Sequence, residues 1–118
     1  MTTETNKEDT TMKEINVIKF VANASEELTK YSTAISEAPT YECARQIGNR
    51  MLGYIDCMIT LSNGMICKEN NGITAMLDEV EQEWIVKTYQ AMIDKATELK
   101  IDNEIVWKLM EKRDEYRA

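Results

Sequence analysis

Residues 44–65, ARQIGNRMLGYIDCMITLSNGM, decide the fold class of this chain of 118 residues. Apolar side chains recur in this stretch in alternating steps of three and four residues, which places them along one face of an α-helix. The positions are Ala44, Ile47, Met51, Tyr54, Met58, Leu61 and Met65. Because sustained spacing of this kind lets long helices pack nearly parallel to one another, the stretch predicts one helix of a bundle.

Two other stretches carry the same spacing, and a third carries a shorter version of it. The first comprises Val17, Val21, Ala24, Leu28, Tyr31 and Ile35. The second, which is less regular, comprises Ile73, Leu77, Val80, Trp84, Tyr89, Met92, Ala96 and Leu99. The short stripe near the C-terminus comprises Ile105, Val106, Leu109 and Met110. We therefore predict an all-α fold, a bundle of three long amphipathic helices plus a short C-terminal helix.

Capping signals predict where the first helix begins and ends. Thr11 and Glu14 match a capping box, so we expect the first helix to begin just after Thr11 and to end before Pro39. Residues 1–11 are polar and lack an apolar run, so they cannot repay the entropy lost on ordering. The prediction is a disordered polar tail at 1–11, followed by a single helical domain at 12–118.

The second helix has a clear start and two alternative ends. Thr40 is a natural N-cap residue. The apolar pattern continues through Asn63-Gly64, which favours a helix that extends to about Glu69, and an earlier end at Asn63-Gly64 is the alternative. Residues 70–72, Asn-Asn-Gly, tolerate left-handed backbone and predict the loop that follows.

The last two helices are bounded by similar signals. We expect the third helix to run from near Thr74 to near Lys100. Asp102 is a natural N-cap for the fourth helix, and Ile101 is placed to pack against Val106 across that cap.

Composition excludes several classes of activity. The chain has 21 acidic and 14 basic residues and a net charge of −7, whereas proteins that bind nucleic acid through its phosphates are usually basic. It has no histidine, which removes Ser-His-Asp and Cys-His nucleophile pairs and the imidazole ligands of di-metal helical bundles. We therefore expect a protein that is not an enzyme, with no metal, no cofactor and no nucleic-acid partner.

Cysteine usage and hydropathy predict the compartment. Cys43, Cys57 and Cys67 form no C-x-x-C pair, and an odd number without a secretion signal points to a reducing cytoplasm. The most apolar window, residues 51–67, is shorter than a membrane span and is interrupted by Asp56. We expect a cytoplasmic protein without membrane contact, in which the cysteines serve as small buried hydrophobes.

The second helix also predicts self-association. Between Met51 and Leu61 it is apolar on most of its circumference, and a helix of this kind has to be covered on several sides. A second copy of the chain could cover the part that the other helices leave open, and a central helix within a monomer is the alternative. The predicted oligomer interface comprises Met51, Tyr54, Met58 and Leu61.

The start of the same helix carries a candidate anion site. Arg45 and Arg50 are two of only four arginines in this acidic chain. Guanidinium groups bind phosphate or carboxylate through paired hydrogen bonds, and a neighbouring aromatic ring can stack on a base. Salt bridges to nearby acidic residues, such as Glu42, are the structural alternative. The candidate ligand-binding residues are Tyr41, Arg45, Asn49, Arg50 and Tyr54.

Two other features are candidates for contact with a partner protein. The acidic run at residues 78–83 could occupy a basic groove, although acidic residues also suit the first turns of a helix. Trp107 lies off the apolar stripe of the fourth helix, so it is expected to face outward, and exposed tryptophan is enriched at interface hot spots. The candidate partner-binding residues are Glu79, Glu81, Glu83 and Trp107.

These features favour two functions. The first is a non-enzymatic helical inhibitor or adaptor that acts by protein–protein interaction as a homo-oligomer. A small, acidic chain rich in lysine and asparagine is typical of accessory proteins of phages and mobile elements, including viral anti-defence proteins; this argument is by analogy. The second is a ligand-sequestering protein, a trap for a small anionic signal such as a cyclic nucleotide, bound near the second helix at a subunit interface.

Overall fold

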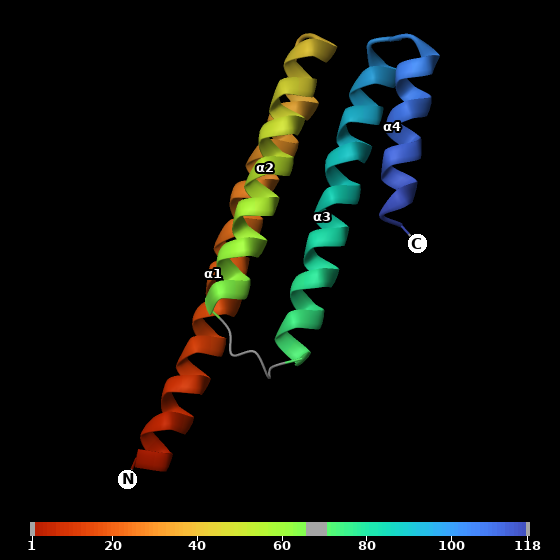
Figure 1. Ribbon diagram of the computed structural model, residues 1–118. Coiled ribbons are helices and arrows are strands. Elements are labelled where there is room, and N and C mark those ends of the chain that lie inside the picture. The colour runs from red at the N-terminus through yellow and green to blue at the C-terminus, as the bar shows by residue number, and fades with distance from the viewer. Residues whose placement is uncertain (1, 66–70, 118) are drawn as a thin grey trace.

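The computed structural model describes residues 2–65 and 71–117, with side chains described at 17–64 and 75–117. Within those ranges the chain forms four helices and no strand (Figure 1). The helices are α1 at Thr2–Glu37, α2 at Tyr41–Met65, α3 at Asn71–Glu98 and α4 at Asn103–Glu115. The predicted all-α class is confirmed. None of these helices combines the length and the apolar character that a membrane span requires.

The N-terminal boundary differs from the prediction. α1 begins at Thr2 rather than after Thr11; residues 2–11 contain no glycine or proline that would interrupt the helix, but five of the ten are threonine, which has a low helix propensity. Figure 1 shows that this end of α1 extends past the end of α2, so it has no helix beside it. An isolated helical segment of this length is marginal in water, and the disorder of residues 1–11 in solution stays a prediction.

α2 begins and continues as its sequence indicates. The Thr40 Oγ1 accepts a hydrogen bond of 3.2 Å from the backbone N–H of Cys43, which confirms Thr40 as the N-cap. The helix continues through Asn63-Gly64 to Met65, so the alternative of an early end is wrong. The further extension to Glu69 lies outside the described residues.

α3 begins earlier than predicted. Asn71 and Gly72, expected in the loop, are the first two residues of the helix, whereas the predicted start is near Thr74. The backbone N–H groups of a first helical turn have no acceptor inside the helix, so asparagine and glycine cost little at these positions. Asn70, the first residue of the predicted loop, lies outside the described residues.

α3 and α4 are joined by a tight turn at residues 99–102. The backbone N–H of Lys100 donates to the carbonyl of Thr97 at 3.1 Å, and that of Ile101 donates to the carbonyl of Ala96 at 2.9 Å. This pair of bonds is a Schellman motif, and Lys100, at φ 55°, takes the left-handed position that glycine usually occupies. Asp102 then caps α4, as predicted, by accepting from the N–H of Glu104 at 3.1 Å.

The main core lies between α1, α2 and α3, which contact one another. Its buried apolar residues come mostly from α1 and α2. They are Val17, Val21, Ala24, Leu28, Ile35, Ala38, Ala44, Met51, Ile55, Met58, Ile59 and Leu77. α2 lies close to α3 at Gly48, where a Cβ atom would lie 2.5 Å from the sulfur of Met92.

The buried face of α2 includes one of the two columns of apolar residues that the sequence predicts, and it replaces the other column. Tyr54 is only half-buried and Leu61 is 54% exposed, whereas the next residues along, Ile55 and Ser62, are buried. The residues buried in alternating steps of four and three along the whole helix are Ala44, Gly48, Met51, Ile55, Met58 and Ser62. The heptad spacing is therefore kept, and the buried face is centred on the side of the Ala44, Met51 and Met58 column opposite to Tyr54 and Leu61.

Three polar side chains are buried within the described residues. Thr88 Oγ1 donates to the carbonyl of Trp84 at 2.7 Å, and Lys95 Nζ lies 3.1 Å from Glu98 Oε2. The hydroxyl of Ser62 has no hydrogen-bond partner in the described part of the chain. The burial of the Ser62 hydroxyl without a partner therefore lowers the free energy of unfolding.

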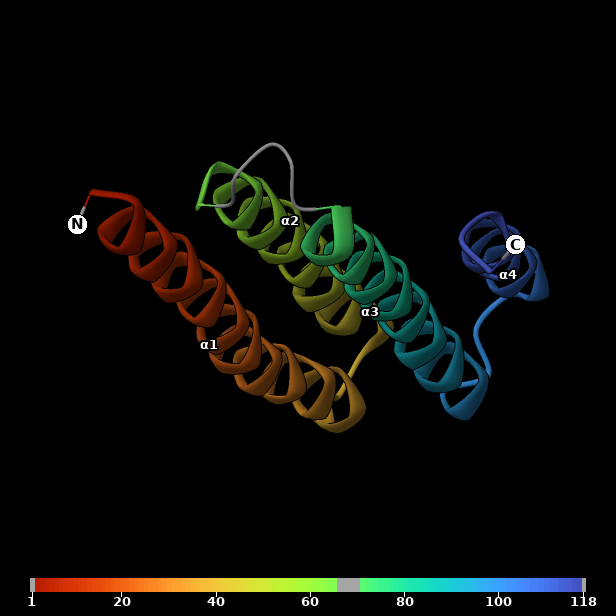
Figure 2. The ribbon, with the colours of Figure 1, turned by 90° about the horizontal axis from the view of Figure 1, so that it is seen from below.

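α4 stands at the edge of the molecule and contacts α3 alone among the described helices. Figure 2 shows α4 apart from α1 and α2. Its buried residues form a second, smaller apolar cluster with α3, separate from the main core. The cluster comprises Met92, Ile93, Ala96, Val106 and Leu109. The molecule is consequently elongated and flat, with extents of 65 × 26 × 14 Å.

Candidate functional site

The predicted ligand-binding residues are divided between two faces of α2. Tyr41 packs against the second cluster, on the side of α3 and α4, whereas Tyr54 faces Tyr31 of α1 with ring centroids 5.8 Å apart. At 100° and 1.5 Å per residue, Tyr41 and Tyr54 point about 140° apart and lie roughly 20 Å apart along the axis. The five residues do not converge within one chain.

Arg45 is already engaged by an acidic neighbour. Its Nε and Nη2 donate to the two carboxylate oxygens of Glu42, at 3.1 and 2.5 Å. The same hydrogen bonds lower the pKa of Glu42 and raise the pKa of Arg45. This is the salt bridge that the sequence analysis gave as the structural alternative. Asn49 and Arg50 are exposed.

The two tyrosines of the candidate site are partly desolvated. Burial raises the pKa of Tyr41, although the charge of Arg45 opposes the rise. Burial also raises the pKa of Tyr54, and the carboxylate of Glu27 adds to the effect. Both phenols therefore stay protonated at neutral pH and can offer a hydrogen bond but no negative charge.

Two of the four residues of the predicted oligomer interface are buried inside the single chain. Met51 is 0% exposed and Met58 is 2% exposed, so neither offers surface to a second copy. Tyr54 is half-buried and Leu61 is exposed. A second copy could contact only Tyr54 and Leu61 of this set without a rearrangement of the helices, and the interface stays a prediction.

The acidic run of α3 does not form one surface. Glu79 and Glu83 are four residues apart and share a face, whereas Glu81 points about 160° away from each of them. Glu83 forms an ion pair with Lys87 at 3.0 Å. Glu81 is partly buried, and its pKa is raised by desolvation first and by the charges of Asp78 and Asp56 second.

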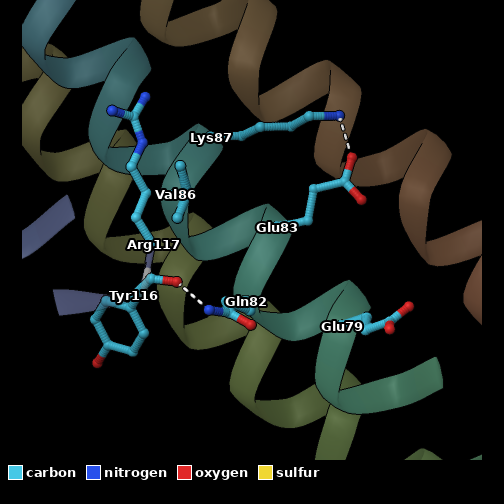
Figure 3. A pocket seen from close by; sticks show the side chains of 7 residues that line it. All are labelled: Glu79, Gln82, Glu83, Val86, Lys87, Tyr116 and Arg117. Atoms are coloured by element: carbon cyan, nitrogen blue, oxygen red, sulfur yellow. Dashed lines mark hydrogen bonds and ion pairs between the residues drawn. The ribbon is translucent and has the colours of Figure 1, made fainter. Parts of the chain in front are cut away.

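Glu79 and Glu83 border an open hollow where α4 ends. Its cavity volume is about 520 Å³ (Figure 3). The lining residues are Glu79, Gln82, Glu83, Val86, Lys87, Tyr116 and Arg117. Figure 3 shows Arg117 on one side of the hollow and Glu79 on the other. Both signs of charge are present, so the hollow has no preference for an anion or a cation.

Tyr116 holds the end of α4 against α3. Gln82 Nε2 donates to the carbonyl oxygen of Tyr116, and the rings of Tyr116 and Tyr89 stack with centroids 6.4 Å apart. A smaller hollow, lined partly by Asp78, Glu81 and Glu115, lies next to Tyr116 as well. Tyr116 is not among the residues predicted from the sequence, where its only signal is its spacing of seven residues from Leu109 in a charged segment.

Trp107 is the most exposed of the large apolar residues in the described part of the chain, at 66%. It lies on α4 on the side away from Val106 and Leu109, as the sequence predicts. The other tryptophan, Trp84, is partly buried against the core, and the ammonium of Lys87 lies 4.6 Å from its ring centroid. Trp107 is therefore the tryptophan that is free to meet a partner.

The surroundings of Trp107 are mostly polar. At helical spacing its neighbours along α4 are Asn103, Glu104, Met110 and Glu111. Glu104 and Lys108 form an exposed ion pair at 3.6 Å. The result is a single large apolar side chain with a polar, mainly acidic rim.

No group of three or more cysteine, aspartate and glutamate side chains that could hold a metal ion is present among the described residues. Comparisons of the chain with protein-family models, curated proteins and solved structures gave no match. The geometry of the described surfaces is thus the basis for an inference about function.

Proposed function

We propose that this chain is a non-enzymatic binding protein, an adaptor or inhibitor that contacts another protein through the outer face of α4. Trp107 is the centre of that contact, and its 66% exposure is the observation that carries the proposal. An exposed tryptophan keeps a large apolar area in water, and such residues dominate the free energy of many protein interfaces when a partner covers them.

The arrangement of α4 supports this use. One side of the helix is packed on α3, and no other described helix contacts it, so its outer side is open along its length. An apolar anchor surrounded by polar residues is the usual anatomy of a hot spot and its rim. Because the rim and the chain as a whole are acidic, the complementary partner surface carries an apolar pocket bordered by basic residues.

Function without catalysis is consistent with the residues that are present. The sequence has no histidine. Within the acidic run on α3, Glu79 and Glu83 line one open hollow, and Asp78 and Glu81 line the smaller one. An adaptor or inhibitor needs only a rigid surface, which four packed helices supply.

The alternative function, a trap for a small anionic ligand, has less support from this geometry. Tyr41 and Tyr54 lie on different faces of α2, and the guanidinium of Arg45 is held by Glu42. Residues of two copies would have to meet to form the pocket. Trp107 needs no such rearrangement.

The test compares three forms of the chain as baits for proteins of the source cell. Wild type and Ile18→Ala should capture the same partner, and Trp107→Ala should lose it. Ile18 is the matched control because it is also a large exposed apolar residue, at 48%, on a different helix and outside the candidate sites. A partner retained equally by all three baits would contradict the proposal.

A further inference from the structure

α4 is a separable part of the fold. It contacts only α3 among the described helices, and its buried residues belong to the second apolar cluster rather than to the main core. Its removal from α3 would leave the contacts between α1, α2 and α3 in place. α4 can therefore dissociate as a unit while the rest of the molecule stays folded.

The turn that folds α4 back onto α3 contains no helix-breaking residue. Residues 99–102 read Leu-Lys-Ile-Asp, without glycine or proline. The direction of the chain is reversed at Lys100, whose φ of 55° is strained for a residue with a Cβ atom. A helical backbone at Lys100 would relieve that strain, and a helical backbone also at Asp102, whose ψ is 128°, would join α3 and α4 into one helix from Asn71 to Glu115.

The apolar pattern would be continuous along such a helix. It runs through the turn in steps of four and three residues, and its members on either side of the turn are Met92, Ala96, Leu99, Asn103, Val106 and Met110. Only Asn103 in this series is polar. The sequence of the turn is thus compatible with both conformations.

If α3 and α4 form one continuous helix, the face of α3 on which α4 packs becomes exposed and needs another packing partner. That face presents Tyr89, Ile93 and Ala96, which together form an apolar stripe. The surface that fits it is α4 of a second copy. Arg113 Nη1 would donate to Gln90 Oε1, as it does within the chain at 2.8 Å.

We propose that the chain forms a dimer by exchange of α4, in which each α4 packs on α3 of the other copy. Every contact between α3 and α4 is kept, and only the backbone of the turn changes. A short turn that strains the closed monomer favours exchange of this kind. The proposal is independent of the proposed function, because Trp107 faces outward in both forms.

The first test uses the wild-type chain. It is refolded at about 1 mM and its mass is measured by light scattering, where the monomer is 13.6 kDa. A dimer is then prepared from equal amounts of ¹³C-labelled and unlabelled chains. A nuclear Overhauser effect between Tyr89 and Tyr116 of differently labelled copies is the expected result, because their rings are stacked. A chain that stays monomeric, or a dimer in which this effect occurs only within one copy, would overturn the proposal.

The second test changes the turn at one residue. Lys100→Gly removes the strain of the closed turn and weakens the continuous helix, so it should raise the dimer dissociation constant roughly a hundredfold. Lys100→Ala is the matched control, since alanine keeps the strain and favours a helix, and it should change the constant by less than about threefold. Equal effects of the two substitutions would also overturn the proposal.

Discussion

Alanine at each of two glycines of α2 should have opposite effects on the free energy of unfolding. Gly53 lies in the helix interior, and a Cβ atom there would have nothing within 4 Å. Gly53→Ala should therefore stabilise the chain by about 0.5–1 kcal/mol, the usual cost of glycine relative to alanine in a helix. This corresponds to a rise in Tm of about 4 °C for a change of 1 kcal/mol.

Gly48→Ala carries the same gain in helix propensity, but the new methyl group meets Met92. Its Cβ would lie 2.5 Å from the Met92 sulfur, 3.0 Å from Cγ and 3.3 Å from Cε. Displacing a buried side chain by this much costs about 1–3 kcal/mol. The net expectation is a loss of about 1 kcal/mol, so the two alanine variants should differ by about 2 kcal/mol.

Urea unfolding followed by circular dichroism at 222 nm measures both values. A double-mutant cycle with Met92→Ala locates the cause, because removal of the long side chain also removes the clash. Gly48→Ala should then be stabilising in the Met92→Ala background, so that its effect differs by about 2 kcal/mol from that in the wild type. Equal stabilisation by both glycine substitutions, or an additive cycle, would refute the predicted close approach of α2 and α3.

Three further predictions concern single side chains. Ser62→Ala should stabilise the chain by about 1 kcal/mol in urea unfolding because it removes a buried hydroxyl without a partner, whereas Thr88→Val, which loses a bond to Trp84, should not. Glu81→Gln should stabilise the chain at pH 7 and lose that advantage below the ordinary carboxyl pKa of 4.5. Because the pKa of Glu81 is raised in the folded chain, the wild type loses stability as the pH rises through that raised pKa, and glutamine does not. A difference in unfolding free energy between Glu81→Gln and wild type that is the same at pH 4 as at pH 7 would contradict the prediction. Cyclic nucleotides should leave Tm unchanged because Glu42 occupies Arg45, and a ligand-dependent rise that Arg45→Ala abolishes would instead favour the trap.

The periodicity of apolar residues was sufficient to predict the helices and much of the core. Thr40 and Asp102 cap their helices as their residue types indicate. The spacing was less accurate at single positions, since it selected Tyr54 and Leu61 where the structure buries Ile55 and Ser62. Residues three and four positions away from a buried residue can each share its face, and the choice between them depends on how α1 and α3 pack on α2.

The candidate surfaces were harder to predict than the helices. The outward direction of Trp107 followed from the stripe of α4, because a helix with one buried face must turn its other residues to solvent. The contact of Tyr116 with Gln82 and Tyr89 did not, because it depends on the angle of the turn at Lys100. A left-handed lysine has no local signal in the sequence, where glycine would have been expected.

The dissociation constant of a complex between the chain and its captured partner tests the central proposal most directly. Trp107→Ala should weaken binding at least 30-fold, equivalent to about 2 kcal/mol, while its urea unfolding stays within about 0.5 kcal/mol of wild type because the side chain is exposed. Ile18→Ala, at an exposed apolar residue of α1, should leave the constant unchanged. A loss of less than about threefold for Trp107→Ala would show that the outer face of α4 is not the binding surface.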